Sequence, residues 1–114
     1  MKRVYICASL GGNISDNIEQ AKGYARYAFE CGTAPVVPHF YALVLDDADP
    51  AQRELGMKAG QSLLWITDEI WVFGDTLTPG MKAEIKLAKQ LNIKIRYFDR
   101  KSKSGGIYET KKSI

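Results

Sequence analysis

The sequence is poor in the residues that build disulfide-stapled or metal-bound domains. It contains two cysteines, Cys7 and Cys31, and one histidine, His39. Two cysteines are too few for a disulfide scaffold, and no Cys/His spacing resembles a zinc site. We therefore expect a reduced, cytoplasmic protein that holds no metal and no other cofactor.

Long apolar runs are absent as well. The longest run near the start, Val4 to Ala8, is much shorter than the roughly 20 residues of a membrane helix or the about 7–15 residues of a signal-peptide core. We therefore expect neither membrane insertion nor export.

The composition is that of one compact domain. The 114 residues are 46% hydrophobic and 25% charged, and a chain of this size can bury a core without staples. Residues 1–98 hold 11 basic and 11 acidic side chains, whereas residues 99–114 hold five and two. A neutral body disfavours bulk nucleic-acid binding. We predict one domain over residues 1–98 and a mobile basic tail over 99–114, in which Ile107 and Tyr108 can pair as a short strand.

Strand and helix patterns alternate along the chain. Strands are predicted over residues 4–8, 35–39, 70–73 and 93–98. Helices are predicted to begin at 15–17, 49 and 78, and to end near 32, 66 and 91. This order predicts a three-layer α/β/α fold with a parallel sheet of four to five strands and right-handed crossovers. Ligands of such sheets bind beyond the carboxyl ends of the strands.

Two of the helix starts have clear capping signals. Asp49 and Thr78 each stand before a proline that suits the first helical position. Gly56 and Gly60 lie four residues apart on the helix that Asp49 begins. Glycine in a helix costs stability, so we expect the sheet or a ligand to pack closely against the backbone there.

The loop after the first strand, Ser9 to Asn13, is small and glycine-rich and leads into a helix. Backbone N–H groups and the positive end of the helix can there face an anion such as a phosphate. The alternative is a plain strand-to-helix turn, because the loop fits neither a Walker motif nor G-x-G-x-x-G.

Glu84 stands out on the third predicted helix. At about 100° per residue it shares an arc with Met81, Ile85, Ala88 and Leu91. A carboxylate on an apolar arc needs a hydrogen bond, a partner or a cleft. A half-exposed glutamate at the margin of the arc, paired with a lysine, is the alternative.

His39 and a group of acidic residues belong to the second of the loops that should converge at the sheet edge. His39 suits a ligand contact or a general acid, or else a hydrogen-bonded structural role. Asp46, Asp47 and Asp49 form an acidic turn in which Asp49 already caps a helix, so we do not expect a metal there.

Three aromatic side chains are further candidates for binding a base. Tyr5, Trp65 and Trp71 have the flat faces on which a ring can stack. Aromatic residues in strands and at helix ends more often belong to the core, and the sequence leaves both interpretations open.

Three segments have the pattern of a known superfamily: residues 4–8 with the loop that follows, residues 67–74 and residues 78–85. The segments Pro38-His39 and Arg53-Glu54-Leu55-Gly56 share this likeness. Together they resemble the nucleoside 2-deoxyribosyltransferase-like superfamily, specifically its small bacterial and phage branch. The resemblance spans about residues 3–98. It implies a flavodoxin-like α/β fold, homodimers or larger homo-oligomers, and action on the N-glycosidic bond of a nucleoside or nucleotide.

The resemblance also implies roles for individual residues. Glu84 matches the family's nucleophile, which attacks the anomeric carbon of the sugar. The loop after the first strand matches the segment that holds the 5′-phosphate in related nucleotide N-hydrolases. The predicted substrate-binding residues are Tyr5, Ser9, Leu10, Gly11, Gly12, Asn13, Gly80 and Met81.

Two aspartates of the family are missing here, because their positions fall near Gly60 and at Thr78. Asp75 in the third loop, or His39 and the aspartates of the second loop, can take over proton transfer. The predicted catalytic set is therefore Glu84, Asp75 and His39, in an N-glycosidase or deoxyribosyltransferase-like enzyme. The alternatives are a non-catalytic protein that senses or sequesters a nucleotide, and a structural or interaction module.

Overall fold

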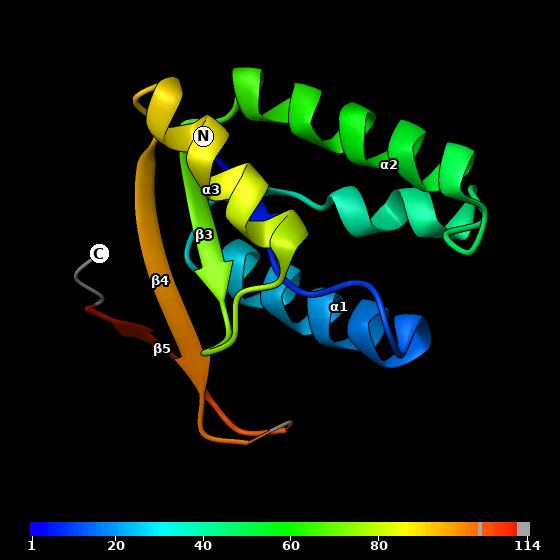
Figure 1. The fold of residues 1–114 in the computed structure, drawn as a ribbon. Coiled ribbons are helices and arrows are strands. Elements are labelled where there is room, and N and C mark those ends of the chain that lie inside the picture. The colour runs from blue at the N-terminus through cyan, green and yellow to red at the C-terminus, as the bar shows by residue number, and fades with distance from the viewer. Residues whose placement is uncertain (103, 112–114) are drawn as a thin grey trace.

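Strands and helices alternate along the chain as far as the fourth strand (Figure 1). A computed structural model describes residues 1–102 and 104–111. The elements are β1 (Arg3–Cys7), α1 (Ile14–Glu30), β2 (Ala34–Val36), the 3-10 helix η1 (Pro38–Leu43), α2 (Pro50–Ser62), the 3-10 helix η2 (Leu63–Ile66), β3 (Glu69–Phe73), α3 (Pro79–Gln90), β4 (Lys94–Arg100) and β5 (Ile107–Thr110).

The described strands form one sheet in the order β2-β1-β3-β4-β5. The first four run parallel to their neighbours, and β5 pairs antiparallel with β4. The first four strands follow the flavodoxin-like order, in which the chain reverses its direction across the sheet after β2. The predicted α/β class and flavodoxin-like fold are confirmed, with an antiparallel strand added at one edge.

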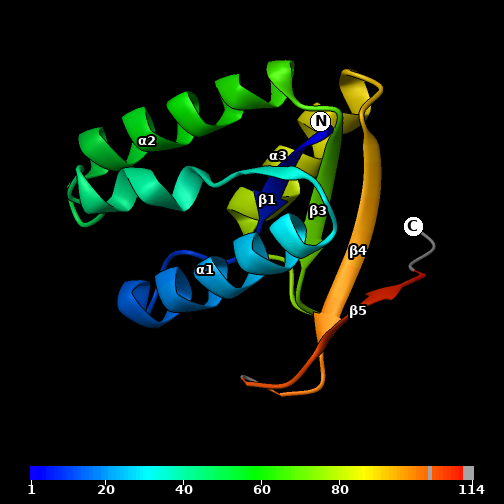
Figure 2. The same cartoon turned by 180° about the vertical axis from the view of Figure 1, so that it is seen from behind.

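Helices cover both faces of the sheet, and β1 shows how the sequence arranges this. Alternate side chains of a strand point to opposite faces. Val4, Ile6 and Ala8 pack on the side of α1, whereas Tyr5 and Cys7 pack on the side of α3. Figure 1 shows α3 in front of the strands, and Figure 2, seen from behind, shows it on the far side.

The helix starts agree closely with the capping signals. Asp49 and Thr78 accept hydrogen bonds from the first turns of α2 and α3, as predicted. α1 begins slightly earlier than predicted, because Asn13 is its cap and accepts from the Asp16 N–H at 3.0 Å. In the described parts of the chain, no helix combines the length and apolar composition that crossing a membrane requires.

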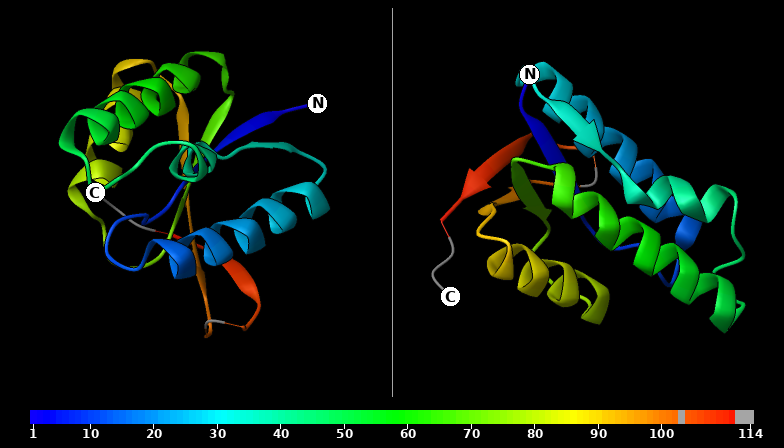
Figure 3. Two further views of the ribbon diagram at one scale, coloured as in Figure 1. Left: turned by 90° about the vertical axis from the view of Figure 1, so that its right-hand side faces the viewer. Right: turned by 90° about the horizontal axis from the view of Figure 1, so that it is seen from above.

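The segment after β2 differs from the prediction. The strand ends at Val36, and His39 lies instead in η1, as its second residue. Pro38 explains the difference, since it lacks the N–H that a strand ladder uses and its fixed φ suits the first position of a helix. η1 runs alongside α2, as Figures 2 and 3 show.

The sheet extends beyond residue 98. β4 is the last but one strand of the sheet and has a neighbour on each side, because Ile107 and Tyr108 belong to the edge strand β5. At the end of β4, the Arg100 guanidinium lies 4.8 Å from the ring centre of Tyr24 and donates to the Gln20 side chain at 3.0 Å. This region of the predicted tail is thus joined to α1. Residue 103 and residues 112–114 of the predicted tail lie outside the described residues.

Candidate functional site

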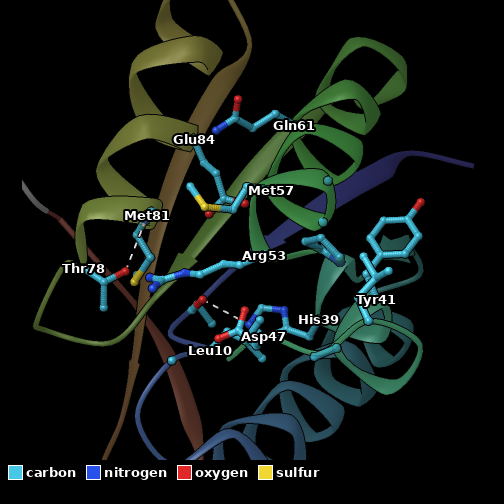
Figure 4. A pocket seen from close by; sticks show the side chains of 18 of the residues that line it. Leu10, His39, Tyr41, Asp47, Arg53, Met57, Gln61, Thr78, Met81 and Glu84 are labelled. Atoms are coloured by element: carbon cyan, nitrogen blue, oxygen red, sulfur yellow. Dashed lines mark hydrogen bonds between the residues drawn. The ribbon is translucent and has the colours of Figure 1, made fainter. Parts of the chain in front are cut away.

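A cavity of about 490 Å³ lies where the loop after β1 meets η1, α2 and the first half of α3 (Figure 4). Its size is in the range of about 300–1,000 Å³ that is usual for small-molecule sites. It lies beyond the carboxyl end of β1, where the order of the strands reverses. This is the position at which sheets of this topology bind ligands.

The structure brings most of the predicted site residues to this cavity. Its wall includes Glu84, His39, Tyr5, Leu10, Gly11, Gly12, Gly80 and Met81. Ser9, Asn13 and Asp75 are not part of the wall. The Ser9 hydroxyl lies 3.7 Å from the Met81 sulfur, Asn13 caps α1, and Asp75 is exposed in the loop before α3.

Glu84 presents its carboxylate at the cavity wall between α3 and β1. The Tyr5 hydroxyl donates a hydrogen bond to Oε2, and the Cys7 thiol lies 3.5 Å from Oε1 as a weaker donor. Both donors are neutral, and no cation of the described residues forms an ion pair with Glu84. Burial raises the pKa of Glu84 to about 7, although the two hydrogen bonds oppose this shift. The carboxyl group therefore changes charge near neutral pH.

Tyr5 and Cys7 reach Glu84 together because they are two residues apart on one strand. Burial, and then the negative charge of Glu84, raise the pKa of both groups, so both keep their protons. Gly60 makes room for Tyr5: a Cβ there would lie 3.4 Å from the Tyr5 hydroxyl and 3.1 Å from the Pro38 Cβ. The close packing expected at this glycine thus comes from the sheet and from η1.

His39 joins η1 to the end of β1. Its Nε2 lies 3.1 Å from the Ala8 carbonyl oxygen and 3.2 Å from that of Ser9, so this nitrogen carries the proton and donates. Burial lowers the pKa of His39, although these two bonds oppose the shift. The buried Nδ1 has no hydrogen-bond partner among the described residues. His39 is therefore a neutral, anchored ring in the wall.

The loop after β1 offers its backbone to open space. Gly12 has φ +81°, a conformation that favours glycine, and a Cβ at Gly11 or Gly12 would meet no atom within 4 Å. From α1, the Asn17 amide donates to the carbonyl oxygens of Leu10 at 2.9 Å and Gly11 at 2.8 Å. These bonds engage the carbonyls of the loop. Anion binding by this loop stays a prediction.

One face of α2 contributes residues that the sequence analysis did not select. Arg53, Met57 and Gln61 line the cavity together with Gly56 and Gly60. The spacing of three and four residues puts all five on one helix face. Gly56 and Gly60 had already indicated a close approach on this face. Applying the same helical spacing to the rest of α2 would have identified Arg53, Met57 and Gln61 as well.

The cavity has a second carboxyl group in Asp47, which belongs to the acidic turn before α2. Gly60 and Thr78, near and at which the resemblance to the superfamily implies aspartates, both lie in the wall and provide no carboxylate. Among the described residues, no group of three or more His, Cys, Asp and Glu side chains is arranged to hold a metal ion. The polar chemistry of the cavity therefore centres on Glu84, Asp47 and Arg53.

The tryptophans lie away from the cavity. Trp71 is 1% exposed and packs against Phe98, with ring centres 4.7 Å apart, so it belongs to the core. Trp65 is 70% exposed and is not part of the wall. Tyr41 from η1 is the second aromatic residue of the wall besides Tyr5, within the described part of the chain.

Two solved structures show the class of proteins that shares this fold. A 2-deoxyribosyltransferase from Bacillus psychrosaccharolyticus superposes with a TM-score of 0.68 at 11% identity, over 85% of this chain and 72% of that chain. A CMP N-glycosidase from Clostridium botulinum superposes with a TM-score of 0.52 at 18% identity, over 89% of this chain and 71% of that one. The resemblance stated from the sequence is thus confirmed at the level of the fold.

The family follows from the sequence match. Residues 2–98 match the family described as Domain of unknown function (DUF7768), and the chain belongs to it. No curated protein matches the sequence at a significant level. The family match ends within β4, so β5 lies outside it.

Proposed function

We propose that the protein cleaves the N-glycosidic bond of a nucleoside 5′-monophosphate or a related nucleotide, with Glu84 as the nucleophile. The observation that carries this proposal is the Glu84 carboxylate at the cavity wall, held by Tyr5 and Cys7. The likeness of the fold to a deoxyribosyltransferase and a CMP N-glycosidase supports the choice of bond.

The first step forms a covalent intermediate. An oxygen of ionised Glu84 attacks C1′ of the sugar, and the bond between C1′ and the base nitrogen breaks. The electron pair of that bond leaves with the base, which takes up one proton. In the second step water attacks C1′, Glu84 leaves as a carboxylate, and the proton that the water loses restores the group that protonated the base. A second base in place of water would give a transferase.

Asp47 is the group that we propose to pass a proton to the departing base. It is the second carboxyl group of the wall, and Figure 4 shows it on the far side of Arg53 from Glu84. His39 is less suited, because its Nε2 proton is engaged by two backbone carbonyls. Asp75 lies outside the wall. Proton donation to a leaving group requires a group within reach of the base.

The phosphate of the substrate is assigned to the loop Ser9 to Asn13. The open space in front of Gly11 and Gly12 and the bonds from Asn17 to the loop carbonyls support this assignment. Backbone N–H groups in such a loop stabilise an anion without needing a side chain.

The proposal is tested by offering the protein matched nucleosides and nucleoside 5′-monophosphates, CMP among them, and following free base by chromatography. We expect base to be released from at least one monophosphate. Glu84→Gln protein purified in the same way controls for contaminating enzymes. Absence of release from every compound would reject the enzymatic proposal.

A non-catalytic nucleotide-binding protein is the alternative, favoured by the absence of carboxylates at Gly60 and Thr78. Thermal stabilisation by a monophosphate without any release of base would support it. Absence of both stabilisation and release would favour an interaction module.

We also propose that the chain assembles into homodimers or larger homo-oligomers. Phe40 and Leu43 on η1 and Val44 directly after it are 60%, 64% and 69% exposed, and a second copy of the chain would remove this apolar surface from water. Sedimentation at several protein concentrations tests this, and a monomer at all of them would reject it.

A further inference from the structure

One side chain of the cavity wall has a charge that is not neutralised within the described chain. The Arg53 side chain on α2 forms no ion pair and no hydrogen bond with the described residues, whereas the side chain of the adjacent Glu54 pairs with Lys58 at 3.3 Å. Arg53 is also the sole lysine or arginine among the described residues that line the cavity. Its charge is therefore available to a ligand.

The Arg53 side chain extends over the cavity, so its charge lies where a ligand would bind. Figure 4 shows Arg53 reaching from α2 across the cavity toward Thr78 and Met81, at the first turn of α3. Arg53 is an exposed residue, so its head also keeps contact with water. Here the guanidinium is directed toward the space between two walls of the cavity.

The opposite walls offer backbone groups and no competing cation. Gly11 and Gly12 leave open space where a side chain would stand, and Gly80 follows Pro79 at the start of α3. The start of a helix has a partial positive charge. An anion between the guanidinium and this helix start would be attracted by both.

We infer that Arg53 is the specificity-determining residue that makes a phosphate group a requirement for binding. The phosphate lies between the guanidinium and the loop containing Gly11 and Gly12. The planar guanidinium can donate two parallel hydrogen bonds to phosphate oxygens, and the loop itself contains no cationic side chain. This inference rests on the proposed function and adds to it that Arg53, beyond the loop, makes the phosphate a requirement, so that free nucleosides are excluded.

The experiment measures binding by calorimetry for pairs that differ only in the phosphate, such as cytidine with CMP and deoxyadenosine with its 5′-monophosphate. Inorganic phosphate serves as a competitor. We expect the unmodified protein to prefer the monophosphate of at least one pair. In Arg53→Gln this affinity falls by about 10- to 100-fold, because the charge-assisted hydrogen bonds are lost. Arg53→Lys should fall in between, since it keeps the charge and loses the fork.

Lys58→Gln is the matched control. It removes one positive charge from the same helix, but Lys58 is exposed and is not part of the cavity wall. Its affinity for the monophosphate should stay within about twofold of the unmodified protein. Equal weakening in Lys58→Gln and Arg53→Gln would show a general effect of charge and would overturn the inference.

Failure of this inference can be told apart from failure of the proposed function. Arg53-dependent binding of a monophosphate without release of base would uphold the inference and reject the enzyme. Release of base from nucleosides and monophosphates at equal rates would uphold the enzyme and reject the inference about Arg53. Unchanged monophosphate affinity in Arg53→Gln, or absence of monophosphate binding by the unmodified protein, would also overturn the inference.

Discussion

Two glutamates, one at the start of β3 and one on α3, show how differently the same side chain can be used. Glu69 begins β3 and is 4% exposed. Its carboxylate accepts hydrogen bonds from Lys2 at 2.8 Å, Trp71 at 2.8 Å and Arg96 at 3.3 Å. Glu84 lies on α3 against β1 and has the neutral donors Tyr5 and Cys7. One carboxylate is surrounded by cations and the other faces a cavity.

This difference separates the pKa values of the two groups. Burial raises the pKa in both cases. At Glu69 the hydrogen bonds from Lys2, Trp71 and Arg96 outweigh burial and lower the pKa to about 2. At Glu84 the neutral donors do not outweigh burial, and the pKa is raised to about 7. Glu69 is therefore a fixed charge that supports the fold, whereas Glu84 is a carboxylate kept free to react.

The largest expected difference between the two glutamates is in turnover, measured after each one is replaced by glutamine. Glu84→Gln removes the attacking oxygen, so base release should fall by about three orders of magnitude or more while the fold and nucleotide binding remain. Glu69→Gln, measured at a temperature where it stays folded, should retain turnover. Release rates and circular dichroism on both variants check this. Comparable turnover in the two variants would show that Glu84 is not the nucleophile.

Glu69→Gln should lower the free energy of unfolding more than Glu84→Gln does, and the two effects should depend on pH in opposite ways. Glu69→Gln should lower the free energy of unfolding by about 2–3 kcal/mol at pH 7, because two cations lose their partner. The lowered pKa of Glu69 means that this difference is present above pH 4.5 and disappears as pH falls through about 2. The raised pKa of Glu84 favours the folded state below pH 4.5, and this benefit is lost as pH rises through about 7.

Urea unfolding of the two variants and the unmodified protein between pH 3 and 8 measures both effects. Above pH 7, Glu84→Gln should be more stable than the unmodified protein, since it no longer holds a buried charge. Parallel pH curves for the two variants would contradict the contrast between the two glutamates.

The smallest expected effect is a shift in the pH dependence of turnover, caused by removing either hydrogen-bond donor of Glu84. Since the nucleophile must be ionised, turnover should rise with pH through about 7 and then level off. Tyr5→Phe and Cys7→Ala each remove a hydrogen bond to the charged form, so the midpoint of this rise should move to higher pH. Tyr5→Phe should move it further, because a hydroxyl is a stronger donor than a thiol. Rates measured over pH 5–9 check the order, and an unmoved midpoint in both variants would contradict it.

Local chemistry made part of the molecule predictable. Asp49 and Thr78 were identified as caps because each precedes a proline, and a cap depends on only a few neighbouring residues. Glu84 was identified because a carboxylate on an apolar arc conflicts with its surroundings. Both signals lie within one helix, and the structure places the caps and the Glu84 side chain accordingly.

Other features depend on contacts between distant segments. The hydrogen bonds of His39 to the end of β1 follow from how η1 turns after Pro38, and the strand prediction did not contain that turn. The position of Arg53 across the cavity depends on how α2 lies against α3. The pairing of β5 with β4 joins segments on either side of a turn that strand patterns alone left open. Spacing along the chain shows which residues share a face, but not what that face meets.

The antiparallel strand β5 has a practical consequence for handling the protein. A fragment ending at residue 98, where the family match stops, would finish inside β4 and lose Glu109, which receives two hydrogen bonds from Arg96. The backbone N–H and C=O groups of β4 that β5 now pairs would be left unpaired, forming an open edge that recruits other chains and promotes aggregation. Expression vectors for this protein should therefore include the whole hairpin of β4 and β5 and not stop at the boundary of the sequence match.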